Sequence, residues 1–364
     1  MQPIRFSVIA GPRQRPDRDQ SASDAWHSYV GDAVRAEELG FDSVFIGEHH
    51  FCFAQGNSSP FVMLAEIAAR TERVRLGTSV LCAPFHNPLR VAEDIAAVDI
   101  VSKGRFELGI GVGSQYEEFQ TFGIPPEERF GRTWETLDII ERCFSGEEEV
   151  FSHEGKYFNF PEVRWIIPPV QEKIPIWWGG FGPQGVTRAA KRGYNLIAPD
   201  VTGVYSATLR EQGDRPENHY VGFVTMVSVA DTREEAFDAI GDPVLFVNNV
   251  YLTRRELDGT TPPDPGLTLE SLRAANAEDQ QTVMFNPVAD TVDGVIERLL
   301  PLARGALGPM NHFGLEFRPP GTSTDHVIKS MTLFAREVMP VLREEAEKTQ
   351  RAAVEAAGQE GAAA

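Results

Sequence analysis

Residues 74–113 read VRLGTSVLCAPFHNPLRVAEDIAAVDIVSKGRFELGIGVG, and this stretch contains a complete strand–helix–strand unit. The apolar, β-branched run 74–81 predicts a strand, and 106–110 predicts a second one. Between them, 88–102 has the helical spacing of apolar residues and opens on a proline, which is favoured in the first turn of a helix. Two strands joined by a crossover helix pair in parallel, so the stretch predicts an α/β fold with a parallel sheet.

The same alternation of apolar runs and helical segments continues along the chain. Further strands are expected at 4–10, 43–46, 174–178, 196–198, 220–229 and 312–317, and helices at 33–39, 61–70, 133–144, 186–192, 232–250 and 327–342. Eight strands, each followed by helical sequence, predict a closed (β/α)8 barrel of the TIM type, with an open doubly wound sheet as the competing architecture. The chain length and the absence of an obvious domain break favour the barrel.

Two long segments interrupt the alternation. Residues 146–173 are expected to be an insertion before the fifth strand, and residues 258–285 an insertion before the eighth. The second insertion carries the Pro-rich segment 260–266, which is typical of a lid. We expect one barrel domain over residues 1–342, followed by an Ala- and Glu-rich tail, 343–364, that frays outside the fold.

Composition and charge argue against several classes of protein. The chain has 364 residues, of which 42% are hydrophobic, enough to bury a large core. With 34 Lys and Arg against 53 Asp and Glu, its net charge of −19 disfavours binding to nucleic acid and to anionic lipid surfaces.

Cys52, Cys82 and Cys143 lie far apart without a C-x-x-C pair, which is typical of a reducing compartment. Because we find no signal-like start and no long apolar run, we expect a cytoplasmic protein with no membrane span.

Chemically capable residues gather where the predicted strands end, and active sites of such barrels lie at the carboxyl ends of the strands. The second strand ends in Glu48-His49-His50-Phe51, and an imidazole at a strand end can act as a general base near neutral pH. Adjacent strand residues point to opposite sides, so only one of the two histidines can face a cofactor. The alternative is a pair of hydrogen-bonded structural histidines. A metal site is disfavoured because no H-x-x-H or H-x-x-x-H spacing places two histidines on one helix face.

A glycine-rich loop follows the fifth predicted strand. Gly179-Gly180-Phe181-Gly182-Pro183-Gln184-Gly185 leads from that strand into a helix. Glycines allow the backbone to approach an anion closely, and the unpaired N–H groups at a helix start bind anions, so the loop suits a phosphate group. An ordinary strand-to-helix turn is the alternative.

In their joint order and spacing, these segments resemble the bacterial luciferase-like flavin monooxygenases. The matching segments are LGFDSVFIGEHHF (39–51), HNPLRVAED (86–94), SKGRFELGIGVG (102–113), PIWWGG (175–180), AAKRG (189–193) and FNP (285–287). The resemblance covers most of residues 4–342. It implies a (β/α)8 barrel that uses reduced FMN and O2 or, in a sister branch, the deazaflavin F420. It also implies a cis peptide at Ser79–Val80 against the flavin ring.

The resemblance assigns roles to particular residues. It makes His49 the catalytic residue and places His50 beside it. Cofactor contacts are expected from Thr78, Ser79, Gly111, Ser114, Gly180, Phe181, Gly182 and Gln184. The substrate pocket is expected to be lined by His50, Phe51 and Phe85, and no metal is expected.

Two departures from the family pattern concern the phosphate of the cofactor. Val112 stands where the luciferase branch has an arginine, and Phe181 and Gly182 stand where it has a Glu-Ser pair. The way the phosphate is held, and the choice between FMN and F420, therefore stay open. The loop 11–24 contains three other cations: Arg13, Arg15 and Arg18. This loop either contacts the phosphate or is an ordinary solvated loop.

The sequence thus predicts the oxygenase of a two-component system that acts on a small apolar carbonyl or aromatic substrate. No G-x-G-x-x-G motif opens a strand–helix–strand unit, so a separate NAD(P)H:flavin reductase is expected to supply reduced FMN. Small residues of helices 61–70 and 88–102 are expected at a homodimer interface: Ala65, Ala68, Ala69, Ala92, Ala96 and Ala97. The alternatives are an F420-dependent oxidoreductase and a non-catalytic flavin-binding protein.

Overall fold

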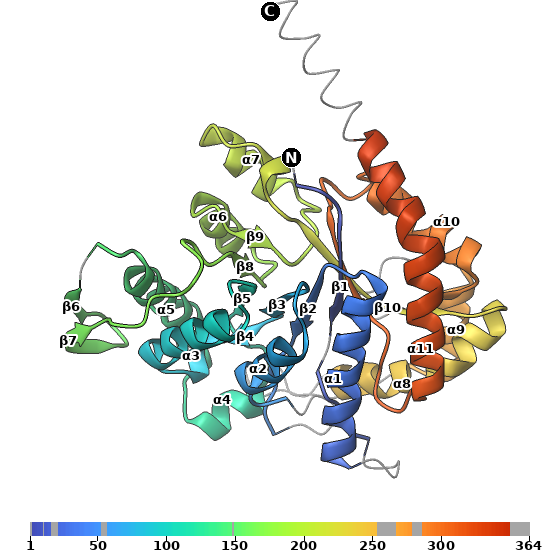
Figure 1. The fold of residues 1–364 in the computed structure, drawn as a ribbon, viewed down its shortest axis with the longest axis horizontal. Coiled ribbons are helices and arrows are strands. Elements are labelled where there is room, and N and C mark those ends of the chain that lie inside the picture. Colours follow the sequence, from blue (N-terminus) through green and yellow to red (C-terminus); the bar gives the residue numbers. More distant parts are fainter. Residues whose placement is uncertain are drawn as a thin grey trace, which may run out of the picture.

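The computed structural model describes residues 2–9, 11–15, 21–51, 57–147, 149–252, 267–278 and 286–349. Its main sheet is parallel, and eight of its strands overlap the eight expected ones (Figure 1). In spatial order they are β10 (Gly222–Val229), β12 (His312–Glu316), β1 (Arg5–Ile9), β2 (Ser43–Ile46), β3 (Arg75–Thr78), β5 (Phe106–Gly111), β8 (Ile176–Trp178) and β9 (Asn195–Leu196). Leu196 forms a parallel bridge with Val221, immediately before β10, and so closes the ring of strands. The expected α/β fold with a parallel sheet is confirmed.

Helices lie around the outside of this ring (Figure 1). They are α1 (Ala22–Leu39), α2 (Pro60–Arg70), α3 (Pro88–Val101), α5 (Arg129–Phe144), α6 (Pro183–Lys191), α7 (Val204–Glu211), α8 (Arg233–Leu252), α10 (Val292–Ala303) and α11 (Thr324–Leu333). Local chemistry explains their ends: Ser21 and Asp24 form a capping box at the start of α1, and Gly40 ends it with a φ of 85°. The Asn87 side chain caps the first turn of α3. Within the described ranges, no helix is both long enough and apolar enough to cross a membrane.

Several short elements were not expected from the sequence. The additional helices are α4 (Tyr116–Phe122), α7, α9 (Leu269–Ala277) and α10. The additional strands β4 (Leu81–Cys82) and β11 (Val288–Asp290) extend the main sheet beside β5 and β10. The expected strand 74–81 is interrupted, because β3 ends at Thr78 and the Ser79–Val80 peptide is cis. This cis peptide agrees with the family resemblance.

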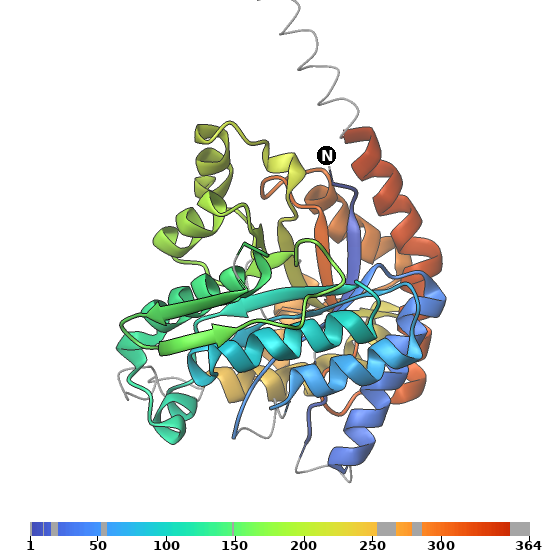
Figure 2. The ribbon, with the colours of Figure 1, turned by 60° about the vertical axis from the view of Figure 1, so that its left-hand side comes forward.

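The two segments expected to be insertions are described to different extents. Residues 146–173 contain an antiparallel hairpin, β6 (Val150–Glu154) and β7 (Asn159–Arg164), which forms a separate two-stranded sheet, drawn in green in Figure 2. In the second segment, α9 is described, whereas the Pro-rich part 260–266 lies outside the described residues.

The C-terminal boundary differs from the expected one. Helical structure continues through residue 349, and Ala346 is buried at 5% exposure. The expected end of the domain at residue 342 therefore falls inside a helix, because that helix still packs an apolar side chain into the core beyond this point. Residues 350–364 of the expected tail lie outside the described residues.

A buried carboxylate connects four strands inside the ring. Glu107 of β5 is 1% exposed and accepts hydrogen bonds from Arg5 of β1 at 2.9 Å and from Arg75 of β3. The indole N–H of Trp177 in β8 donates to its second oxygen at 2.7 Å. The Arg5 guanidinium also lies 4.0 Å from the centre of the Tyr220 ring. Arg5, Arg75 and Glu107 all stand in the first two residues of their strands, so this polar cluster fills the amino end of the ring.

We expect Glu107→Gln to lower the free energy of unfolding by about 3 kcal/mol, because it leaves two largely buried guanidinium groups without their carboxylate. Equilibrium urea unfolding measures this change. The matched control is Glu72→Gln, since Glu72 is exposed and pairs only with Lys103 on the surface in the described part, and it should lose less than about 1 kcal/mol. Equal losses in the two variants would contradict a structural role for Glu107.

Candidate active site

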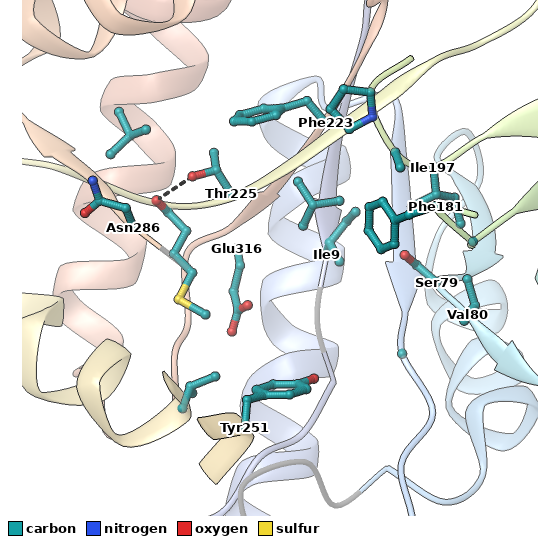
Figure 3. Close-up of a pocket in the computed structure, with 18 of the residues that line it drawn as sticks. Ile9, Ser79, Val80, Phe181, Ile197, Phe223, Thr225, Tyr251, Asn286 and Glu316 are labelled. Atoms are coloured by element: carbon teal, nitrogen blue, oxygen red, sulfur yellow. Dashed lines mark hydrogen bonds between the residues drawn. The ribbon is translucent and has the colours of Figure 1, made fainter. Parts of the chain in front are cut away.

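A cavity of about 700 Å³ opens at the carboxyl ends of the strands (Figure 3). Ile9, the last residue of β1, lines one side of the cavity. Gly47 and His49, which follow β2, also line it. The Ser79–Val80 peptide borders it between β3 and β4. The cavity therefore lies where the barrel fold predicts an active site.

His49 is the sequence-predicted catalytic residue, and the structure places it on the cavity wall. Its Nδ1 lies 3.3 Å from Oε1 of Glu118, which belongs to α4. Its Nε2 lies 3.2 Å from the hydroxyl of Tyr251, which belongs to α8 and also lines the cavity. The imidazole is thus held from both ring nitrogens, and Nε2 is the nitrogen on the side of Tyr251.

The segment around His49 is a loop rather than a strand. Residues 47–50 carry no strand structure, so the alternation argument does not apply to the two histidines. Side chains hold the loop instead: Asn57 donates to the Gly47 carbonyl at 3.0 Å, and the His50 backbone N–H donates to Glu118 at 2.7 Å. Of the two histidines, His49 borders the cavity and His50 does not.

His50 belongs to a second cluster behind the cavity. Its Nε2 lies 2.7 Å from Glu48 Oε1, and Nε2 of His86 lies 2.6 Å from the same oxygen. The other Glu48 oxygen accepts the Cys82 backbone N–H at 2.6 Å. Burial tends to raise the pKa of the Glu48 carboxyl, but the hydrogen bonds from the two histidines outweigh this and lower that pKa.

These three side chains have the donor types of a metal site, which the sequence spacing did not suggest. The distances of 2.6 and 2.7 Å from Glu48 Oε1 to the imidazole nitrogens are hydrogen-bond lengths. Glu48 therefore holds both imidazoles, and the cluster supports the loop that carries His49.

The aromatic residues expected in the substrate pocket lie elsewhere. His50, Phe51 and Phe85 do not line the cavity; they form an aromatic cluster with Phe122 of α4. Phe51 has a φ of 59° and is 63% exposed, so the chain turns its ring outward. Contrary to expectation, none of the three lines this cavity: the loop after β2 departs from strand geometry at His50 and Phe51, and Phe85, which follows β4, stacks on Phe122.

The expected cofactor residues divide into two groups. Ser79 and Phe181 line the cavity. Thr78 and Gly111 lie behind its wall: the Thr78 hydroxyl donates to the Gly109 carbonyl at 2.6 Å, and a Cβ at Gly111 would meet the Val80 side chain at 2.5 Å. Ser114, Gly180, Gly182 and Gln184 also stand outside the cavity lining.

The glycine loop leads into α6 without a side-chain cap. Gly182 is the N-cap residue, no side-chain hydrogen bond caps the helix, and Pro183 occupies its first turn. Under the loop, Trp178 is 1% exposed, and its Nε1 has no hydrogen-bond partner among the described residues. A Cβ at Gly180 would lie 2.7 Å from that nitrogen, so the close packing of the loop over the indole requires glycine there. Main-chain N–H groups in the first turn of a helix, apart from that of proline, can bind an anion.

The arginines of the loop 11–24 are already engaged. Arg13 lines the cavity and pairs with Glu316 at 2.7 Å. Arg15 is buried, pairs with Asp242 at 2.6 Å and lies 4.6 Å from the centre of the Phe246 ring. Arg18 lies outside the described residues. The alternative of a merely solvated loop does not hold for Arg13 and Arg15.

Sequence reasoning missed three polar residues of the site: Glu118, Tyr251 and Glu316. Glu316 ends β12, faces the cavity in Figure 3 and is 4% exposed. Burial raises the pKa of its carboxyl, and the Arg13 guanidinium opposes this rise. The rule of strand ends could have found Glu316, whereas no local signal marks the other two.

The far side of the cavity is apolar. Its lining comes from β10, α8, β11, α10 and the segment that follows α10: Phe223, Met226, Val247, Val288, Leu299, Leu302 and Leu307. Arg298 of α10 also borders it, but this guanidinium donates to Asn276 at 2.9 Å and to the Pro287 carbonyl at 3.2 Å. A ligand in this region therefore meets mainly aliphatic and aromatic surface.

Comparison with curated proteins gives matches of two kinds. The chain is 29% identical over 358 residues to 4-hydroxyprotoasukamycin monooxygenase of Streptomyces nodosus subsp. asukaensis, covering 93% of this chain and 92% of that protein. It is 26% identical over 361 residues to the oxygenase component of the flavin-dependent trigonelline monooxygenase of Acinetobacter baylyi, covering 94% and 96%. It is 37% identical over 186 residues to an F420-dependent glucose-6-phosphate dehydrogenase of Kineococcus radiotolerans, covering 49% of this chain. In that last case, and with an uncharacterised protein y4vJ of Sinorhizobium fredii, the match spans about half of the relative's length.

Comparison with solved structures supports the fold. The monooxygenase RslO1 from Streptomyces bottropensis matches with a TM-score of 0.79 and 23% identity, covering 93% of this chain and 99% of that one. The oxygenating constituent of 3,6-diketocamphane monooxygenase from Pseudomonas putida, solved in complex with FMN, matches with a TM-score of 0.74 at the same identity and coverage.

The family model described as luciferase-like monooxygenase matches residues 4–306, which is most of the chain. Relatives within the matches depend either on a flavin or on F420. This chain belongs to the luciferase-like monooxygenase family.

Proposed function

We propose that this protein is an oxygenase that uses reduced FMN and O2 to oxidise a small apolar carbonyl or aromatic compound. The observation that carries the proposal is one cavity of about 700 Å³ that joins His49 and the Ser79–Val80 segment to a large apolar region. Ligand cavities in proteins span about 300–1,000 Å³. The volume is therefore large enough for a flavin ring and a small substrate together.

The phosphate of the cofactor fits the start of α6. The main-chain N–H groups that follow Pro183 in the first turn of α6, which no side chain caps, would supply hydrogen-bond donors for it. Gly180, Phe181, Gly182 and Gln184 would surround the group there, and Ser79 would meet the ring inside the cavity. Val112 packs against the hydrophobic core, so this mode of binding needs no arginine at that position.

When bound, reduced FMN would supply the electrons that activate O2 for transfer of one oxygen atom. The chain's own residues then have two tasks. The apolar lining, including Phe223 and Val288, excludes water from the reacting region. His49 accepts and returns a proton at Nε2, the nitrogen next to the Tyr251 hydroxyl on the cavity wall.

The cavity also favours a class of substrate. Its apolar region would hold a hydrocarbon or aromatic body, while the Arg13–Glu316 pair offers one place for a polar group. Because the two charges neutralise each other, this place suits a neutral carbonyl or hydroxyl better than an ion. The same features support the small carbonyl or aromatic compound expected from the sequence.

The second candidate function is F420-dependent hydride transfer. Its support is the 37% identity to an F420-dependent dehydrogenase over about half of this chain. Fluorescence titrations of the purified protein with FMN, reduced FMN and F420 distinguish the two candidates. Tight binding of F420 together with weak binding of reduced FMN would replace the first proposal by the second.

We expect the purified chain to oxidise NADH only slowly in the presence of FMN, because a separate reductase supplies the reduced flavin. Adding a NAD(P)H:flavin reductase should start substrate-dependent O2 consumption, measured with an oxygen electrode. The control reaction contains the reductase and FMN without this chain. Rapid NADH oxidation by the pure chain would rule out the two-component arrangement.

We also propose a homodimer through α2 and α3. Of the six alanines expected there, Ala69 and Ala97 are exposed, whereas Ala68, Ala92 and Ala96 pack into their own barrel. Larger exposed apolar side chains lie on the same two helices: Val62 on α2 and Ile100 and Val101 on α3. Such residues are suited to pack against a second copy.

Val62→Asp combined with Ile100→Asp should convert the dimer to a monomer, because it buries two carboxylates in the contact. Light scattering after gel filtration at micromolar concentration measures the mass. Ile166→Asp is the matched control, since Ile166 is 75% exposed but lies in the segment 146–173, and it should remain dimeric. A monomeric wild type, or a dimer unaffected by the double change, would exclude this interface.

His49→Ala should lower turnover by about 10²- to 10⁴-fold, the usual contribution of a positioned acid or base, while the affinity for reduced FMN changes little. Single-turnover mixing of the reduced-flavin complex with O2 and substrate measures the rate, and thermal melts check the fold. His50→Ala is the control. It breaks a hydrogen bond to buried Glu48, so it should affect stability more than the chemical step. Normal turnover of His49→Ala would overturn the catalytic assignment.

A further inference from the structure

We infer that Glu118 is a positioning residue, which fixes the proton of His49 on Nδ1 and so presents the lone pair of Nε2 to Tyr251 and the cavity. The inference rests on the proposed role of His49 and names the groups that control it. The juxtaposition comes from three separate parts of the fold: the loop after β2, helix α4 and helix α8.

The carboxylate is placed to accept and not to donate. Glu118 is 1% exposed, and its Oε1 receives the His50 backbone N–H at 2.7 Å. The same oxygen lies 3.3 Å from His49 Nδ1. An oxygen that already receives one N–H acts as an acceptor, so His49 must carry its proton on Nδ1 to bond with it. The neutral imidazole then has its lone pair on Nε2.

The second oxygen of Glu118 strengthens this assignment. Oε2 is buried without a hydrogen-bond partner among the described residues. A buried carboxylate oxygen without a partner is costly to stability, so packing alone gives no reason to keep one. The contact of the other Glu118 oxygen, Oε1, with His49 gives a functional reason for the buried carboxylate.

Tyr251 completes the arrangement from the opposite side. Its hydroxyl lies 3.2 Å from His49 Nε2, and its side chain lines the cavity. With the proton on Nδ1, Nε2 accepts the phenolic O–H. Tyr251 therefore links the histidine lone pair to a hydroxyl on the cavity wall, along which a proton can pass to or from a bound ligand.

The first experiment reads the tautomer of His49 without relying on activity. Nitrogen-15 NMR of histidine-labelled protein at about pH 8, where free imidazole is neutral, distinguishes a proton on Nδ1 from one on Nε2. His49→Ala identifies the resonance. We expect the Nδ1–H form in the wild type and a shift to the Nε2–H form in Glu118→Leu, which lacks the acceptor. A wild type in the Nε2–H form, or an unchanged tautomer in Glu118→Leu, would overturn the inference.

The second experiment tests the effect on the reaction. Glu118→Leu should lower kcat by about tenfold or more, up to the loss caused by His49→Ala, with little change in the KM for reduced FMN. Glu118→Gln keeps an acceptor oxygen of nearly the same shape, so it should fold and should recover the Nδ1–H form and part of the lost rate. Glu117→Leu is the matched control, because Glu117 is exposed on the same turn of α4, and it should behave as the wild type.

The outcomes separate the inference from the function it rests on. If His49→Ala loses turnover but Glu118→Leu does not, the positioning role is wrong while the proposed function stands. If His49→Ala turns over normally, the proposed function fails, and the NMR result still decides the tautomer. Tyr251→Phe should lower the rate while leaving His49 in the Nδ1–H form; a change of tautomer in that variant would contradict the assignment of Glu118 as the controlling group.

Discussion

The fold depends on a charge cluster at the amino end of the ring of strands. Glu107 joins the guanidinium groups of Arg5 and Arg75 and the indole of Trp177, so one carboxylate connects β1, β3, β5 and β8. Buried charges are tolerated only when they are paired and hydrogen-bonded, and this pairing fixes the strands relative to one another. Because the amino end is filled in this way, the carboxyl end can remain hollow and hold ligands.

Two further buried carboxylates organise the site in the same way. Glu48, itself part of the loop 47–50, accepts hydrogen bonds from two imidazoles and one backbone N–H. Glu118 holds the same loop and His49 from the side of α4. In each case a buried carboxylate organises groups that the chain brings from distant positions. A loop without regular structure is thereby held firmly enough to fix His49 at the cavity wall.

The parallel sheet and most outer helices could be predicted, because β-branched runs and helical spacing are local properties of the chain. His49, Ser79 and Phe181, to which strand ends and the family resemblance pointed, all line the cavity. Phe51 lies elsewhere because the loop after β2 does not continue the strand, and Phe85, which follows β4, packs on Phe122 instead. Glu118 and Tyr251 were missed because they stand 69 and 202 residues from His49 along the chain.

By itself, the sequence determined the class of fold, the family and the histidine that borders the cavity. These follow from periodicity and from motifs whose residues are neighbours in the chain. The tertiary structure alone decided which side chains hold His49 and that the Trp178 indole N–H is buried without a described partner beneath the glycine-rich loop. It also decided which residues face the cavity. The physical reason is that hydrogen bonds and burial act over a few ångströms in space, and the closing of the ring of strands sets those distances.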